Sequence, residues 1–280
     1  MARTKSLFLA TMLMVLGAAP ALADNMKLVV AVEGAFPPYN EVGPDGNLQG
    51  FDVDFAREIC KKIQADCELV KQDWDGMIPG LLAKKYDVII SSMGILPERE
   101  EKIDFTIPYY QAPTGLVALK SAGAKAGADG YPDGDSLAGK KIGVQRATAY
   151  ESWAREKWPK AEIVVYDSSQ SADLDIQNGR LDARFDDYVL LSDGIMKGEG
   201  ADQFERVGNI YTEAAMGSKG EGIALRKGND QLKESINKAI LAMRQDGSYK
   251  AINDKYGAGT AISIAANTSS CVTKLISRSS

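Results

Sequence analysis

Two serines and one arginine lie just past the end of an apolar segment, where together they could bind an anion. In the stretch "DVIISSMGILPERE", Ser91 and Ser92 follow a strand-like run, and Arg99 lies in the first turn of a charged, helix-like segment. The hydroxyls and nearby backbone N–H groups are neutral donors, and a guanidinium is a fixed fork that binds a carboxylate through two hydrogen bonds. These residues favour a carboxylate site. The alternative is a solvated helix in which Arg99 pairs with Glu98 or Asp104.

Three more side chains follow predicted strand ends and could form the walls of a binding pocket. Glu33 and Phe36 come after the run "KLVVAV", and Trp74 comes after "CELVKQ". An aromatic face can stack on an aliphatic chain or a guanidinium, and a carboxylate can meet a cation. The sequence leaves simpler alternatives open. Phe36 and Trp74 could be ordinary core aromatics, and Glu33 could be a solvated loop residue.

Alternating strands and helices must bring these positions together, and the sequence predicts them from Lys27 onward. The runs "KLVVAVEG", "CELVKQ" and "DVIISSM" are typical of strands, and "FDVDFAREICKKI" and "WDGMIPGLLAKKY" are typical of helices. In the first helix Phe55, Ile59 and Ile63 recur every four residues, which places them on one face. The third strand carries consecutive apolar residues, as expected for a strand buried on both faces of a parallel sheet. This order predicts an α/β unit.

A second α/β series follows a stretch rich in Gly, Ala and Asp, "SAGAKAGADGYPDGDS", which is typical of a surface loop. The two series predict two lobes, one formed by residues 26–112 and 213–257 and the other by residues 113–212. The chain would pass between the lobes near 111–115 and 212–220. A ligand would then bind between the lobes, beyond the carboxyl ends of the strands.

The first residues have the features of a secretory signal peptide, residues 1–23. Arg3 and Lys5 precede an apolar run, and "ALA" at its end has small residues suited to cleavage after Ala23. No Cys directly follows the cleavage point, and no later apolar stretch approaches about 20 residues, so neither a lipid anchor nor a membrane span is expected. We therefore expect an exported, periplasmic protein that is soluble after cleavage.

Composition argues against several kinds of chemistry. The 280 residues carry a formal net charge of −5, which becomes −7 when Arg3 and Lys5 are removed, and an acidic surface argues against nucleic acid and anionic membranes as partners. The sequence has no His, which excludes Ser-His and Cys-His nucleophile pairs and His-ligated zinc. Cys60 and Cys67 favour a disulfide in an oxidising compartment, with two free buried thiols as the alternative, and Cys271 has no obvious partner.

Six sequence blocks follow one another in the order found in a known family: "GFDVDFAREICKKI", "WDGMIPGLLAKKYDVIISSM", "PEREEKIDFTIPYY", "LAGKKIGVQRATAYESW", "GRLDARFDD" and "MRQDGSYKAINDKYG". Over about residues 26–257 the chain resembles the periplasmic amino-acid-binding proteins of bacterial ABC importers, in particular the lysine/arginine/ornithine-, histidine- and opine-binding group of solute-binding protein family 3. The resemblance implies a two-lobed type II periplasmic-binding-protein fold, in which each lobe is a mostly parallel sheet flanked by helices and two hinge strands join the lobes. It also implies a Cys60–Cys67 disulfide and a monomer without cofactor or metal. Such a protein would deliver its ligand to an ABC permease in the inner membrane.

The resemblance also implies how an amino-acid head group would be held. Arg99 would bind the α-carboxylate, with Ser92 and Thr148 as further donors. Asp187 would bind the α-ammonium, and Ser91 with the nearby backbone would accept its remaining hydrogens. The alternative for Asp187 is the N-cap of the helix "YVLLSDGIM", and both roles can coexist.

The side-chain end of the ligand would lie among the remaining positions. By resemblance, Phe36 and Trp74 are the aromatic walls and Glu33 is the acid that meets a cationic side chain. The sequence departs from the family pattern at Gly94, where a serine is usual, and at Ala149, where a threonine is usual. Fewer donors and a roomier pocket are expected from these changes.

The resemblance implies a binding protein rather than an enzyme. Such a binding protein would capture arginine, lysine, ornithine or an arginine-derived opine by closing its hinge. An alternative on the same scaffold is an enzyme similar to the cyclohexadienyl (prephenate or arogenate) dehydratases, for which Asp187 or Glu33 could supply a general acid. Residues 258–280, rich in Ser and containing Cys271, extend past the point where family members usually end. This atypical tail matches no pattern.

Overall fold

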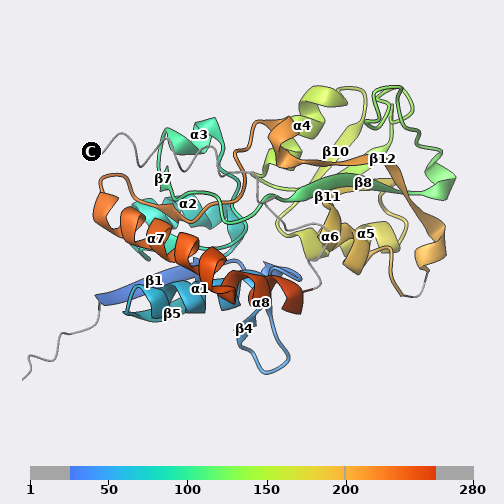
Figure 1. The fold of residues 1–280 in the computed structure, drawn as a ribbon. Coiled ribbons are helices and arrows are strands. Elements are labelled where there is room, and N and C mark those ends of the chain that lie inside the picture. The colour runs from blue at the N-terminus through green and yellow to red at the C-terminus, as the bar shows by residue number, and fades with distance from the viewer. Residues whose placement is uncertain (1–25, 199, 257–280) are drawn as a thin grey trace, which may run out of the picture.

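The computed structural model describes residues 26–198 and 200–256, which form two lobes, each built around a five-stranded sheet (Figure 1). The first sheet has the strand order β5-β1-β6-β13-β7. Its strands are β1 (Met26–Val32), β5 (Ala65–Lys71), β6 (Val88–Ile89), β7 (Asp104–Phe105) and β13 (Ala224–Leu225). A small sheet of β2 (Ala35–Phe36), β3 (Asn40–Val42) and β4 (Leu48–Gln49) follows β1. The predicted signal peptide and tail, with Cys271, lie outside the described residues.

The second sheet repeats the arrangement with the strand order β10-β9-β11-β8-β12. Its strands are β8 (Pro113–Leu119), β9 (Lys141–Gln145), β10 (Glu162–Tyr166), β11 (Ala183–Asp187) and β12 (Phe204–Thr212). In each sheet three neighbouring strands pair in parallel, and the other two pair antiparallel. The predicted two-lobed α/β fold is confirmed.

Helices cover both faces of each sheet. In the first lobe they are α1 (Phe51–Lys62), η1 (Trp74–Gly76), α2 (Met77–Leu82), α3 (Pro97–Glu100), α7 (Asp230–Asp246) and α8 (Ser248–Lys255). The others are η2 (Lys120–Ala122), α4 (Ala149–Lys157), α5 (Ser169–Gln177), α6 (Tyr188–Gly194), η3 (Ala201–Gln203) and η4 (Glu213–Met216). In β1, Val30 packs with side chains of α1 and α7, whereas Ala31 packs with those of α2. This two-sided burial explains the continuous apolar runs of the parallel strands.

The helix α1 forms where the apolar repeat predicts it. Phe55 and Ile59 are fully buried on its inner face, and Ile63, at the helix end, is half-buried. Asp54 in the first turn and Lys62 in the last turn have the charges that stabilise a helix dipole. The amphipathic pattern and the charges at the ends therefore favour the same segment.

A disulfide joins the end of α1 to β5. Cys60 and Cys67 are seven positions apart, and their Cα atoms lie 6.1 Å apart. The predicted bond is thus present, and free thiols are excluded for these two residues. Closing a loop of this length stabilises a folded chain by about 2 to 3 kcal/mol.

The strand that precedes the two serines is shorter than predicted. β6 spans only Val88–Ile89, although the Ile90 N–H still donates to the Ala31 carbonyl (3.0 Å). At Ser92 the backbone φ is 51°, a left-handed conformation that no strand can continue through. Ser91 and Ser92 therefore form a turn at the carboxyl edge of the first sheet.

The chain crosses between the sheets twice, from β7 to β8 and from β12 to β13. The two crossings run side by side. The Glu221 N–H donates to the Tyr110 carbonyl (3.0 Å), and the Ala112 N–H donates to Oε2 of Glu221 (2.8 Å). Domain hinges are built from a few loop or strand-end residues, and these two connecting segments supply such residues between the sheets.

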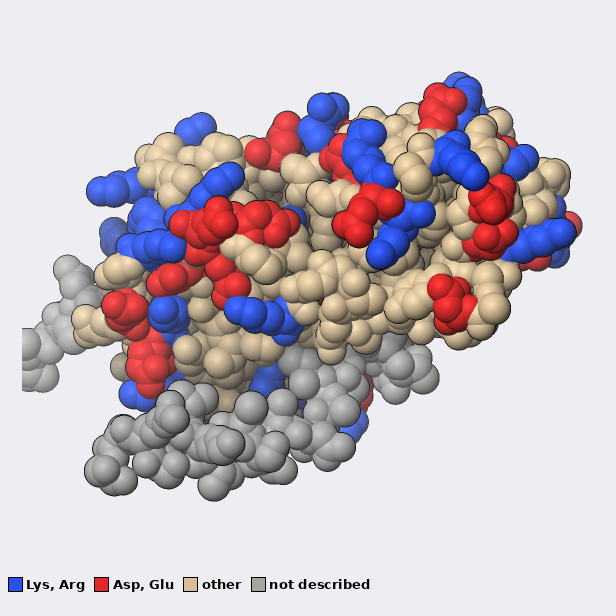
Figure 2. All heavy atoms as spheres, turned by 90° about the horizontal axis from the view of Figure 1, so that it is seen from above, with Lys and Arg blue, Asp and Glu red and all other residues tan. Residues whose placement is uncertain are grey.

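The surface carries charges of both signs. Figure 2 shows one face, where Lys and Arg side chains are interspersed with Asp and Glu over both lobes. Several surface charges of the described residues form exposed pairs, such as Arg146 with Asp167 (2.8 Å) and Lys219 with Glu100 (2.7 Å). Exposed pairs of this kind contribute little to stability one by one. Within residues 26–198 and 200–256, no helix is long and apolar enough to span a bilayer.

Candidate functional site

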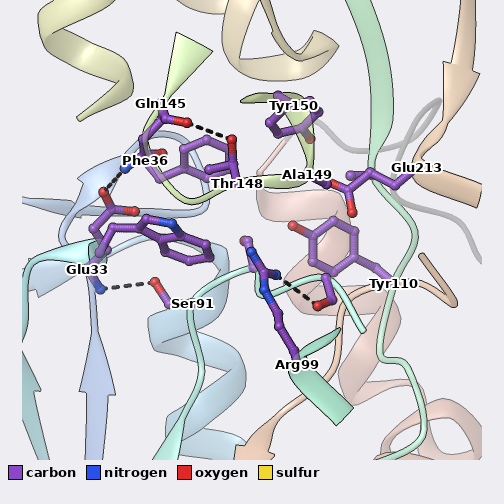
Figure 3. A pocket seen from close by; sticks show the side chains of 14 residues that line it. Glu33, Phe36, Ser91, Arg99, Tyr110, Gln145, Thr148, Ala149, Tyr150 and Glu213 are labelled. Atoms are coloured by element: carbon purple, nitrogen blue, oxygen red, sulfur yellow. Dashed lines mark hydrogen bonds between the residues drawn. The ribbon is translucent and has the colours of Figure 1, made fainter. Parts of the chain in front are cut away.

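A pocket lies between the two lobes, at the carboxyl ends of β1, β6 and β9 (Figure 3). Its lining includes all but one of the ligand-binding residues predicted from the sequence: Glu33, Phe36, Trp74, Ser91, Ser92, Arg99 and Thr148. The exception is Asp187, which does not line it. The fold thus gathers side chains from both lobes that are far apart in the sequence.

Arg99 lies in the middle of the pocket and is only 7% exposed. Its Nη1 donates to the Gly94 carbonyl (2.9 Å), and its Nη2 donates to the Ala147 carbonyl (3.1 Å) of the second lobe. Burial lowers the pKa of Arg99, because desolvation disfavours the charged form. No carboxylate of the described residues forms an ion pair with Arg99, and Asp104 pairs instead with Lys233 (3.0 Å). A buried guanidinium without an ion-pair partner is suited to an anionic ligand group.

Glu33 is the buried acid at one end of the pocket, directly after β1, and is 3% exposed. Its Oε1 accepts a hydrogen bond from Nε2 of Gln145 (2.6 Å), the last residue of β9 in the other lobe. Burial raises the pKa of Glu33 to about 7, and the hydrogen bond from Gln145 offsets part of this rise. A cation bound beside Glu33 would favour its charged form.

Trp74 and Phe36 line the pocket and also pack in the core. They are therefore both pocket walls and core aromatics, the two alternatives that the sequence left open. Each is 8% exposed. The Arg99 guanidinium lies 5.4 Å from the centre of a Trp74 ring, and the indole N–H donates to the Ala147 carbonyl (3.3 Å). Phe36 stacks on Tyr39, with 5.5 Å between ring centres. The two walls are therefore held in place by their own packing.

The predicted hydroxyl donors have protein partners. Oγ of Ser91 accepts from the Glu33 N–H (3.0 Å), and Oγ of Ser92 donates to Oδ2 of Asp52 (2.7 Å). Thr148 donates to the carbonyl at the end of β9 (2.7 Å) and caps the N-terminus of α4. These hydroxyls hold the strand ends and loops in position around Arg99.

Asp187 lies away from the pocket lining and is fully buried. Its Oδ1 accepts from the N–H groups of Val189 (2.7 Å) and Leu190 (3.1 Å), which caps α6, and its Oδ2 accepts from the Tyr39 hydroxyl (3.0 Å). Burial raises the pKa of Asp187 well above its ordinary value. The structure thus shows the capping role and does not bring this carboxyl group into the pocket.

Gly94 does not leave the extra room that the sequence predicted. A Cβ atom placed on Gly94 would lie 2.7 Å from Oε2 of Glu213 and 3.6 Å from Nη1 of Arg99. The expectation of a roomier pocket is therefore wrong at this position, because the carboxylate of Glu213 fills the space that a serine side chain would need.

Four lining residues with polar side chains received no ligand role from the sequence: Tyr110, Gln145, Tyr150 and Glu213. Gln145 ends the strand "KKIGVQ", so the rule that pockets form at carboxyl ends of strands could have found it. Glu213 directly follows β12, where the chain leaves the second lobe. Only the meeting of the two lobes brings Glu213 to the pocket, and no sequence pattern carries that information.

The two lobes contact each other directly across the pocket. Gln145 bonds to Glu33, and the Ala147 carbonyl accepts from both Arg99 and Trp74. No group of three or more His, Cys, Asp or Glu side chains suited to a metal ion occurs within the described ranges. The arrangement can hold a small molecule that carries an anionic group and a cationic group and touches both lobes.

Comparisons with known proteins agree with this geometry. A family model described as bacterial extracellular solute-binding proteins, family 3, matches residues 28–259. An L-arginine-binding protein of Pseudomonas aeruginosa is 39% identical over 239 residues, which cover 85% of this chain and 90% of that protein. A histidine-binding periplasmic protein of Escherichia coli is 35% identical over 238 residues, which cover 84% and 88%.

A solved structure shares the fold as well as the sequence pattern. It is a periplasmic binding protein of Salmonella typhimurium, described in terms of its high arginine specificity. It is 30% identical to this chain, has a TM-score of 0.74, and the match covers 82% of this chain and 99% of that one. The resemblance and the type II periplasmic-binding-protein fold predicted from the sequence are confirmed. Because the family model matches most of the chain, this protein belongs to the bacterial extracellular solute-binding proteins of family 3.

Proposed function

We propose that this protein captures a cationic amino acid, such as arginine, lysine or ornithine, or an arginine-derived opine, and delivers it to an ABC permease in the inner membrane. The observation that carries the proposal is the pocket's charge pattern. Arg99 is buried without an ion-pair partner among the described residues, and the acid Glu33 is buried beside the same pocket. A ligand with a carboxylate and a distal cation complements both groups.

Ligand capture by hinge closure follows from where these groups lie. Arg99 and Glu33 belong to the first lobe, whereas Gln145 and Thr148 belong to the second. A ligand that contacts both sets has more contacts when the lobes are closed, so it shifts the population toward the closed state. A bound ligand would replace the hydrogen bonds that cross the pocket, such as that from Gln145 to Glu33, with hydrogen bonds to its own polar groups.

The named relatives support the wider role. They are amino-acid-binding proteins, two of them described as periplasmic, and their names describe binding rather than catalysis. We propose an exported, periplasmic, monomeric protein with no catalytic activity, cofactor, metal or nucleic-acid partner.

A dehydratase-like enzyme is the second candidate, and one observation favours it. The pKa of Glu33 is raised to about 7 by burial, which is the range suited to a general acid near neutral pH. The same raised pKa also suits a binding residue that becomes charged only when a cationic ligand binds, so catalysis must be tested directly.

Thermal unfolding against a ligand panel tests the proposal. The protein would be unfolded and refolded to remove bound ligand, then melted with cationic amino acids, opines, glutamine, prephenate and arogenate. A true ligand at 100 times its dissociation constant is expected to stabilise the fold by about 2.7 kcal/mol, which raises the melting temperature by about 5 to 10 °C. Stabilisation by prephenate or arogenate with turnover, and by no amino acid or opine, would replace the transport proposal with the enzyme.

A further inference from the structure

A chain of buried polar side chains leads from Gln145 into the second lobe, away from the pocket lining. Oγ of Ser169, the first residue of α5, lies 3.3 Å from Oε1 of Gln145 and 2.6 Å from Oδ2 of Asp186. Oδ2 of Asp186 also accepts from Nη2 of Arg184 (2.8 Å). Ser169, Asp186 and Arg184 are fully buried, and none of them lines the pocket. Direct contact with a ligand therefore does not explain them.

Asp186 and Arg184 form a charged anchor at the inner end of this chain. Nε of Arg184 donates to Oδ1 of Asp173 (2.8 Å), and the Asp187 N–H donates to Oδ1 of Asp186 (2.8 Å). A buried polar network whose members all have partners is held rigidly in one arrangement. The carboxylate oxygen that faces Ser169 is thus fixed in position.

The Ser169 hydroxyl has one hydrogen for two neighbouring oxygen atoms. The charged oxygen of Asp186 lies 2.6 Å away and is the stronger acceptor, whereas the amide oxygen of Gln145 lies at a long 3.3 Å. The hydrogen is therefore directed to Asp186, and the oxygen of Ser169 is left as an acceptor that faces Gln145. The Gln145 amide complements this acceptor when its NH₂ end faces Ser169 and its carbonyl end faces the pocket.

Glu33 holds the amide in the opposite orientation. Nε2 of Gln145 donates to Oε1 of Glu33 (2.6 Å), so the NH₂ end faces the pocket (Figure 3). A ligand cation beside Glu33 would donate to the same carboxylate and would meet the NH₂ group as a second donor. Turning the amide over removes this conflict between donors. Apart from the bond that the ligand replaces, the turned amide gives up only a long contact with the Asp167 carbonyl (3.4 Å).

We infer that Ser169, oriented by Asp186, is a positioning residue that turns the amide carbonyl of Gln145 toward the cationic end of a bound ligand. This inference rests on the proposed function and specifies how the ligand side chain is selected. The ligand cation donates to Oε1 of Gln145, Nε2 donates to Ser169, and Ser169 donates to Asp186. A carbonyl fixed in this way favours a guanidinium, which only donates, over a neutral ureido group, whose oxygen would face it.

L-Arginine and L-citrulline test the inference, because citrulline has the same chain length and carries a neutral ureido group in place of the guanidinium. Both would be titrated calorimetrically into the refolded full-length protein and into Ser169→Ala. The unaltered protein is expected to bind arginine at least about 100-fold more tightly than citrulline, because Glu33 and the Gln145 carbonyl both favour the cation. In Ser169→Ala this ratio is expected to fall by about tenfold, since no acceptor then holds the amide turned over. A packing defect would weaken both ligands alike and leave the ratio unchanged.

A double-mutant cycle shows whether Ser169 acts through Gln145. In Gln145→Ala, the further change Ser169→Ala is expected to alter the ratio by less than about twofold, because the amide is already gone. Ser171→Ala removes an exposed hydroxyl two positions further along α5 and is expected to keep the unaltered ratio. The inference is overturned if Ser169→Ala keeps the ratio, or if it lowers the ratio equally with and without the Gln145 amide.

The same titrations separate this inference from the proposed function. If the unaltered protein binds neither arginine nor lysine, the proposed function fails and the inference fails with it. Tight arginine binding with a ratio that Ser169→Ala leaves unchanged overturns the role of Ser169 alone.

Discussion

Replacing Arg99 with alanine is expected to weaken binding of L-arginine by about 30-fold to several thousandfold. Arg99 is the only Lys or Arg among the described residues that line the pocket between the lobes. Its guanidinium forms no ion pair with any described residue. Without it the ligand carboxylate would be buried with no counter-charge, which is costly. Calorimetric titration of the refolded protein measures the change.

Two other arginine variants sharpen this test. Arg99→Lys keeps the charge but loses the planar fork, so an intermediate affinity is expected. Arg146→Ala removes an arginine next to Gln145 that is exposed, paired with Asp167 and absent from the lining. This matched control should bind within about threefold of the unaltered protein. If Arg99→Ala and Arg146→Ala lose equally little affinity for L-arginine, then Arg99 does not hold the ligand.

Binding of L-arginine is expected to strengthen by up to about 30-fold between pH 5.5 and pH 8, because Glu33 loses its proton over this range. Burial raises the pKa of Glu33 from 4.5 to about 7, so below pH 7 most of the protein carries a neutral Glu33. A guanidinium binds the charged form, so ligand binding must release a proton at low pH. Titrations in buffers of different ionisation enthalpy measure both the affinity and the protons released.

Without ligand, the contribution of Glu33 to folding stability changes with pH in the opposite direction to the affinity for arginine. Glu33 binds its proton more tightly in the folded state than in the unfolded state, so its contribution to the free energy of unfolding falls as pH rises from about 4.5 to about 7. The charged groups that act on Glu33 are Asp186, Lys71 and Asp73.

The variant Glu33→Gln isolates this carboxyl group from others that titrate nearby. Asp52, whose pKa burial raises to about 6, changes charge in the same range and bonds to Ser92. In Glu33→Gln the affinity for arginine should be low and nearly independent of pH. An unchanged pH dependence in this variant would assign the effect to Asp52 or to another group.

Much of the fold could be predicted because its signals are local. Apolar repeats fixed the helix α1, continuous apolar runs marked the parallel strands, and two cysteines seven positions apart form the expected disulfide. Residues that follow strand ends, such as Glu33 and Arg99, could be selected because parallel strands present their carboxyl ends at one edge.

The rest of the site depends on contacts between distant segments. The Tyr39 hydroxyl lies 148 positions from Asp187 and bonds to it, so Asp187 lies outside the lining. The space at Gly94 is filled by Glu213, which comes from the second chain crossing. Neither contact has a signal in the sequence, because each is set by how the two lobes pack together.

A crystal structure with the panel ligand that stabilises the protein most is the most direct test of the account. We predict that the ligand lies between the lobes with its α-carboxylate on the Arg99 guanidinium and its cationic end beside Glu33. A ligand that lies outside this pocket, or that binds with its carboxylate away from Arg99, would contradict the account.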